Sequence, residues 1–255
     1  MSESSSSGEE DYDPTRYAQL NDDLSMPGVE KRMINVLVTG FGPFASHSVN
    51  ASWHAVTELA KLGVAHNVNL VTLEIPVEYK TVQKLIPELW AKYKPHLVVH
   101  VGVSGQSTEI AFETIAHNNG YKQYDVSGHS APSQCFNPEK GDDSLQTGID
   151  INKLCEDVNN SGCLAMVSSS TEAGRYLCEY IFYASLCQDS SRVAFIHVPP
   201  LDQPYTAAEL GHALQCSIQC MLKQLDLYHP LTLPDEHVLE ELKKQHERSV
   251  DGASD

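Results

Sequence analysis

Short apolar, β-branched runs alternate along this chain with longer segments in which apolar residues recur every three or four positions. Three of the runs, Ile34–Gly40, residues 68–75 and His96–Gly102, are expected to be buried strands. Between them, residues 49–62 and 80–93 carry apolar side chains at helical spacing. The alternation of strand and helix predicts a three-layer α/β/α sandwich around a mainly parallel, mixed central sheet.

The second half of the chain is less regular. The elements expected there are a β excursion within 106–118, a long irregular loop over 119–148, a strand at Leu164–Ser168, a helix at Ala173–Leu186, a strand at Arg192–Val198, an amphipathic helix at Thr206–Leu225 with Thr206 as its N-cap, and a short helix at Glu236–Glu247. Because functional groups in open α/β sheets gather at the carboxyl ends of strands, candidate residues are sought just after the strand runs.

The two ends of the chain differ from its middle. Residues 1–30 hold eight acidic residues and one basic residue, and 231–255 hold seven acidic and three basic residues. We therefore expect a disordered acidic, Ser-rich tail at 1–31, one folded domain at 32–230 and an acidic tail at 231–255. The net charge of −17 argues against nucleic acid and anionic membranes as partners.

The cysteines number seven, an odd count that excludes a complete disulfide framework. No two of them form a C-x-x-C pair, so zinc-finger spacing is absent, and no metal or other cofactor is expected. The N-terminus has no apolar signal segment, and no stretch approaches 18 apolar residues. These features favour the reducing cytosol. The sequence does not reveal the oligomeric state, for which we expect a monomer.

Cys178 follows a Ser- and Gly-rich turn between an expected strand and an expected helix. A thiol in the first turns of a helix is near the positive end of the helix dipole, which favours the reactive thiolate. Free backbone N–H groups at the same place can hold an oxyanion. The alternative is a buried structural cysteine.

Two other residues have the chemistry of a thiol's partners. His197 ends an apolar strand just before two prolines, where an imidazole can accept and return a proton. Glu113 is a carboxylate in a locally apolar segment, so it requires a partner if it is buried. A core histidine and an exposed edge-strand glutamate are the alternatives, but together with Cys178 the pair would complete a catalytic triad.

The segment Thr39–Phe44, TGFGPF, superficially resembles a phosphate-binding loop. It is not G-x-G-x-x-G, and Pro43 removes a backbone N–H that a phosphate would use. Phe41 and Phe44 on a glycine-containing turn suit a small, flat, apolar ligand better, with ordinary core packing as the alternative.

Four stretches of the chain occur together, in this order, in one family. They are Val38–Phe44 with Val49–Trp53, Glu74–Tyr79, Val98–Gly105, and Ala173–Cys178 followed by Phe195–Leu201. On these motifs the chain resembles the pyroglutamyl peptidase I family of C15-type cysteine peptidases from about Asn35 to Leu225, and it looks most similar to the animal members. The resemblance implies an omega-peptidase that removes N-terminal pyroglutamate (5-oxoproline) from peptides through an acyl-enzyme.

The resemblance also implies roles for the triad candidates. Cys178 matches the family nucleophile, His197 the general base and acid, and Glu113 the carboxylate. The segment departs from the family pattern at Ala111, where Ser or Thr is usual, and at Thr114, where Lys or Arg is usual.

In the substrate pocket, Phe41 and Phe44 match aromatic residues that pack on the lactam ring. Asn50 looks like the polar contact to the ring carbonyl, and Val103 lies where a backbone group meets the ring N–H. Glu172 stands where the family prefers Asp, Asn or Ser, and residues 121–140 diverge strongly.

Two rival interpretations remain at this stage. One is a catalytically weakened or inactive relative that binds pyroglutamyl or lactam ligands, although such relatives usually lose a triad member. The other is a different α/β enzyme such as a nucleoside phosphorylase-like protein, which would need phosphate-binding basic residues or a donor-rich loop that the sequence does not contain.

Overall fold

The computed structural model describes residues 33–44, 49–105, 107–137 and 141–228. The expected tails at 1–31 and 231–255, and the expected helix at Glu236–Glu247, therefore lie outside the described residues.

A six-stranded mixed sheet forms the centre of the domain, with strands in the order β2-β1-β3-β8-β4-β7. The strands are β1 (Ile34–Phe41), β2 (Val68–Ile75), β3 (Leu97–Val103), β4 (Ile110–Glu113), β7 (Val167–Ser170) and β8 (Val193–Val198). β2, β1, β3 and β8 run parallel to one another, whereas β4 is antiparallel to β8 and parallel to β7. β5 (Ile115–His117) and β6 (Ser144–Gln146) form a separate two-stranded sheet.

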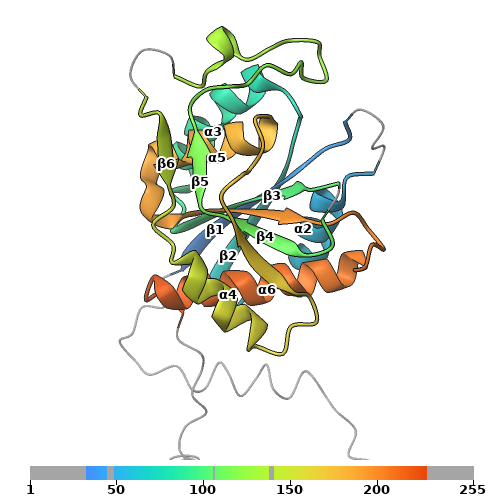
Figure 1. The fold of residues 1–255 in the computed structure, drawn as a ribbon. Helices are drawn as coiled ribbons and strands as arrows, with labels where there is room; N and C mark the ends of the chain where they lie inside the picture. The colour runs from blue at the N-terminus through green and yellow to red at the C-terminus, as the bar shows by residue number, and fades with distance from the viewer. Residues whose placement is uncertain (1–32, 45–48, 106, 138–140, 229–255) are drawn as a thin grey trace, which may run out of the picture. The chain divides into compact units, whose positions relative to one another are not determined.

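Helices cover both faces of the central sheet, as a three-layer sandwich requires (Figure 1). On one face pack α3 (Tyr79–Tyr93) and α5 (Leu177–Asp189), and on the other pack α2 (Ala51–Leu62), α4 (Ile151–Asn159) and α6 (Ala207–Gln224). Pro132–Gln134 and Ser190–Arg192 are short 3₁₀ helices, which complete the elements of the part of the chain that the structure describes. The expected α/β/α fold with a mainly parallel mixed sheet is confirmed.

The two cores follow from the alternation of side chains along the buried strands. In β8, Ala194, Ile196 and Val198 face the α2/α6 layer, while Val193 and Phe195 face the α3/α5 layer. β8 is buried along its whole length, and every residue in it is apolar except His197. That one polar residue lies on the α5 face.

Some elements differ in their boundaries from those expected, and one helix was not expected. The strand expected at Leu164–Ser168 begins only at Val167, because pairing with β4 starts at Ile110 and Leu164 remains exposed. The loop expected over 119–148 contains β6 and a 3₁₀ turn. Helix α4 was not expected, although Asp150 caps its N-terminus.

Candidate active site

Cys178 is the second residue of α5. The helix begins there because Gly174 has a positive φ of 75° and Tyr176, the N-cap, is extended, so residues 173–176 cannot continue a helix. The start expected at Ala173 was therefore four residues too early. The later start puts the thiol inside the first turn, where backbone N–H groups have no helical acceptor and the dipole favours an anion.

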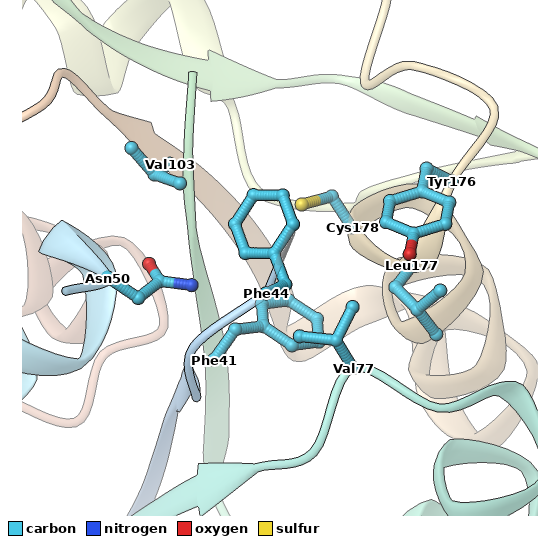
Figure 2. Close-up of a pocket in the computed structure, with 8 residues that line it drawn as sticks. All are labelled: Phe41, Phe44, Asn50, Val77, Val103, Tyr176, Leu177 and Cys178. Atoms are coloured by element: carbon cyan, nitrogen blue, oxygen red, sulfur yellow. The ribbon is translucent and has the colours of Figure 1, made fainter. Parts of the chain in front are cut away.

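His197 is presented to this helix start by β8. Its side chain is buried, and its Nδ1 atom lies 2.7 Å from Glu113 Oε1. The carboxylate therefore holds the proton on Nδ1 and leaves Nε2 as the nitrogen that faces the Cys178 thiol, with which His197 also forms a hydrogen bond. Figure 2 shows the Cys178 sulfur at the edge of the neighbouring pocket.

Glu113 is the last residue of β4 and is almost fully buried. It reaches His197 because β4 is antiparallel to β8, which pairs Glu113 with Phe195 and Ala111 with His197 and puts all four on one face of the sheet. Its Oε2 atom is buried and has no hydrogen-bond partner among the described residues. The expectation that functional residues lie at the carboxyl ends of parallel strands thus accounts for His197. It does not account for Glu113, because β4 is antiparallel to β8.

The pKa of His197 reflects opposing causes. Burial by itself lowers the pKa, but the Cys178 thiolate, and after it the Glu113 carboxylate, outweigh burial and raise the pKa of His197 to about 10. Both neighbours favour the protonated imidazole, as expected where an anion lies on each side of the ring.

A small pocket opens beside the Cys178 thiol (Figure 2). Its lining residues are Phe41, Phe44, Asn50, Val77, Val103, Tyr176, Leu177 and Cys178. All four residues expected from the sequence as substrate contacts thus line one pocket together with the thiol. Sequence reasoning missed Val77, Tyr176 and Leu177, although Tyr176 and Leu177 directly precede Cys178 and are carried to the site by the same helix start.

Asn50 has a double task. Its Oδ1 atom accepts hydrogen bonds from the backbone N–H and the hydroxyl of Ser52 and so caps α2, while Nδ2 donates to the carbonyl of Gly42. A primary amide has two N–H donors, so one of them remains for a ligand in the pocket. These bonds also fix the TGFGPF turn against the start of α2.

A sequence model of pyroglutamyl peptidases matches residues 34–225, which include every residue of this site. The chain belongs to the pyroglutamyl peptidase family. It is 51% identical to human pyroglutamyl-peptidase 1 over 191 residues, which cover 75% of this chain and 91% of the human protein. It is 36% identical to the human pyroglutamyl-peptidase 1-like protein, covering 67% of this chain and 86% of that relative.

Solved structures of the family share the fold. The crystal structure of Bacillus amyloliquefaciens pyroglutamyl peptidase I matches with a TM-score of 0.63 at 26% identity, over 72% of this chain and 94% of that one. A mutant pyrrolidone carboxyl peptidase of Pyrococcus furiosus matches with a TM-score of 0.68 at 22% identity, over 75% of this chain and 100% of that one. The resemblance read from the motifs, nearest to the animal enzymes, is confirmed.

The structure shows the contacts of the three residues that depart from the family pattern. Ala111 pairs with His197 across β4 and β8 and leaves room for the imidazole. The Thr114 hydroxyl donates to the carbonyl of Ser170 and so ties β4 to β7. The Glu172 side chain is exposed and pairs with Arg175.

A buried ion-pair network lies directly after Cys178, and the sequence reasoning did not identify it. Glu179 is fully buried and accepts hydrogen bonds from Arg175 Nη1 and from the backbone N–H of His117. Its carboxylate also forms a hydrogen bond with the His117 ring at Nδ1. It therefore joins the first turn of α5 to the turn before it and to β5. This network fixes the backbone on either side of the thiol.

A second histidine in the central sheet shows how burial affects the pKa of an imidazole that has no charged neighbours. His100, in β3, is completely buried, and its ring nitrogens bond only to the hydroxyls of Thr39 and Ser185. Burial lowers the pKa of His100 to about 3, so this ring is neutral. It is a core histidine, the alternative that we weighed for His197.

Proposed function

We propose that this chain is a cysteine omega-peptidase that removes N-terminal pyroglutamate from peptides. The observation that carries the proposal is the meeting of Cys178, His197 and Glu113 beside a pocket lined by two phenylalanine rings. The three residues come from three different elements, so their meeting is a property of the fold and not of one local motif. Membership of the pyroglutamyl peptidase family supports the same activity.

In the acylation step, the Cys178 thiolate attacks the pyroglutamyl carbonyl carbon. The negative charge that develops on the carbonyl oxygen is held by the free backbone N–H groups in the first turn of α5. His197 donates its Nε2 proton to the departing amine, and the C–N bond breaks to leave a thioester. Glu113 orients the ring and stabilises the imidazolium.

In the deacylation step, the shortened peptide has left and water takes its place. His197 now accepts a proton from the water, whose oxygen attacks the thioester carbon. The C–S bond breaks, pyroglutamate is released, and the thiolate and the imidazolium are restored together.

Recognition of the lactam ring would come from the pocket. Phe41 and Phe44 provide flat apolar surfaces for the ring. The free Nδ2 hydrogen of Asn50 would donate to the ring carbonyl, and the backbone of Val103, the last residue of β3, would accept from the ring N–H. A ring that lacks these polar groups leaves buried donors and acceptors unmatched.

The cellular setting follows from the thiols. All seven cysteines are free, and the nucleophile must stay reduced to act. We therefore place the enzyme in the reducing cytosol. We also propose that it acts as a monomer on soluble peptides and that its folded domain spans residues 32–230. No helix among the described residues is both long and apolar enough to cross a bilayer.

The test is release of aminomethylcoumarin from its pyroglutamyl amide by full-length protein. We expect turnover that an alkylating reagent abolishes, and loss of turnover in Cys178→Ala but not in Cys187→Ala, which removes an exposed thiol elsewhere on α5. The prolyl amide should react at least about 10³-fold more slowly, because proline lacks the ring carbonyl.

Two outcomes would contradict the proposal. Near-normal turnover by Cys178→Ala would exclude this thiol as the nucleophile. Binding of a pyroglutamyl dipeptide by the wild-type protein without any hydrolysis would favour the alternative function, a lactam-binding relative that has lost its activity.

A further inference from the structure

Three metal-ligating side chains meet on the face of the domain opposite α5. Cys163, His212 and Cys216 each offer one ligand atom, and these atoms all lie within 4.8 Å of one another. Cys163 and α6 pack with the α2/α6 core, whereas Cys178 packs with the core on the other face of the sheet. The cluster is therefore separate from the peptidase site.

Helix α6 supplies two of the three groups at a fixed separation. His212 and Cys216 are four residues apart and so lie on the same helical face, one turn from each other. The Cys216 Sγ atom is 3.8 Å from His212 Nε2. The helix is held at its start by a complete capping box between Thr206 and Glu209, so this pair belongs to a rigid element.

The loop between α4 and β7 supplies Cys163. The two ends of this loop are clamped, because the Asn159 side-chain amide both accepts from the backbone N–H and donates to the carbonyl of Val167. Gly162, with a positive φ of 81°, turns the chain immediately before Cys163. The loop therefore presents the third group toward α6 in a defined geometry.

The distances suit a metal ion of borderline softness. With Zn–S bonds of about 2.3 Å and Zn–N bonds of about 2.0 Å, a tetrahedral ion holds its ligand atoms roughly 3.5–3.8 Å apart. The His212–Cys216 pair already has this separation, and Cys163 needs to move by no more than about 1 Å to reach it. Two thiolates and an imidazole are ligands that Zn²⁺ prefers over Mg²⁺ or Ca²⁺.

We propose that Cys163, His212 and Cys216 form a Zn²⁺-binding site whose fourth position is open to solvent. His212 is exposed, which gives the ion a path in and a place for water. The spacing along the sequence did not predict this site, because 48 residues separate Cys163 from His212 and only the fold brings them together. Binding ties the α4–β7 loop to α6.

Binding is coupled to proton release. A thiol binds Zn²⁺ as its thiolate, so each S–Zn bond that forms releases a thiol proton. Zn²⁺ replaces the protons on the two thiols, which leave to the solvent, and two S–Zn bonds form. The affinity should therefore increase with pH.

The experiment uses full-length, untagged Cys178→Ser protein, so that the peptidase thiol cannot bind the probe. The protein is reduced, freed of metal with a chelator and titrated anaerobically with Co²⁺ while thiolate-to-cobalt charge-transfer absorption is recorded. We expect saturation at one equivalent, and displacement of Co²⁺ by Zn²⁺ with a rise in Tm. This absorption requires thiolate ligands, so carboxylates elsewhere in the acidic chain do not produce it.

Matched variants locate the site. Adding Cys163→Ser and Cys216→Ser should abolish the absorption, whereas adding Cys187→Ser, an exposed thiol on α5, should leave it unchanged. His212→Gln changes an exposed side chain, so it should fold normally, and it should weaken binding by at least about tenfold. In protein that retains Cys178, these variants should hydrolyse substrate at the wild-type rate.

Two results would overturn the proposal. The first is absorption that persists in the Cys163→Ser/Cys216→Ser variant or is missing from the parent. The second is loss of two titratable thiols on mild oxidation without any response to Co²⁺ or Zn²⁺, which would make the pair a disulfide and not a metal site. Neither result depends on whether the chain has peptidase activity.

Discussion

A Cβ atom added to Gly102 would lie only 2.7 Å from the Cys178 Sγ atom. The same added atom would lie 2.8 Å from Phe195 Cζ and 3.2 Å from His197 Cδ2. Gly102 pairs with His197 between β3 and β8, so it lies directly beside the place where the Cys178 thiol and the His197 imidazole come together. Glycine is therefore needed at this position because the thiol, Phe195 and His197 leave no space for a side chain, and not because the backbone there requires glycine.

The first prediction is that Gly102→Ala disables the enzyme while leaving it folded. The added methyl must push the thiol away, and a displacement of about 1 Å can reduce kcat about 10²-fold. Overpacking should also cost about 1–3 kcal/mol of unfolding free energy. Gly105→Ala is the matched control, since nothing lies within 4 Å of its added Cβ. Equal kcat values for the two variants would contradict the prediction.

The second prediction concerns pH. Cys178 and Glu113 outweigh burial and raise the pKa of His197 to about 10, so the ring keeps the proton that, in the proposed mechanism, it gives to the leaving amine. Raising the pH removes that proton only near the raised pKa, so kcat/KM should persist well above about 6.5, the ordinary imidazole value, and fall toward pH 10. An alkaline limit near pH 6.5 would show that His197 is unperturbed.

The third prediction isolates the carboxylate. Glu113→Gln keeps the shape but removes the charge, and we expect kcat to fall by about 10- to 10⁴-fold with little change in KM. The alkaline limit of kcat/KM should also move to lower pH, because one cause of the raised pKa is gone. Glu109→Gln, an exposed change just before β4, is the control. Full kcat in Glu113→Gln would make the carboxylate purely structural.

Much of this fold could be predicted from the sequence because its strands are buried and its helices have one apolar face. β1, β2 and β8 begin and end within a residue of their expected bounds, and Thr206 caps α6 as expected, with Glu209 completing the capping box. These elements are determined by local pattern. Their boundaries coincide with changes in polarity that any reader of the sequence can see.

The remaining features depend on contacts between distant segments. The true start of α5 is set by backbone conformation at Gly174 and Tyr176, which the apolar pattern does not reveal. The place of Glu113 depends on antiparallel pairing of β4, which strand spacing cannot predict. α4 was missed although Asp150 and the apolar spacing after it gave a readable signal.

The fourth prediction concerns the pocket. Phe44→Ala should raise KM about tenfold and leave kcat nearly unchanged, because the proposed contact with the lactam ring would be present in both ground and transition states. Phe41 is less suitable for this test, since it is buried in the core and its loss would destabilise the fold. Phe136→Ala, an aromatic residue that packs on Tyr180 outside the pocket, should not change KM. A large loss of kcat in Phe44→Ala would contradict ground-state binding by this ring.

The fifth prediction tests the ion-pair network around Glu179, the residue that follows Cys178. Glu179 is fully buried and charged, and Arg175 is the cation that pairs with it. Arg175→Ala would leave that charge with only His117 as partner, so we expect a loss of about 3–5 kcal/mol of unfolding free energy in urea titrations. Glu172→Gln is the matched control, because it removes a carboxylate that contacts the same Arg175 but is exposed, where ion pairs contribute at most about 1 kcal/mol. If Arg175→Ala is no less stable than Glu172→Gln, the buried carboxylate is held by its backbone and histidine contacts alone.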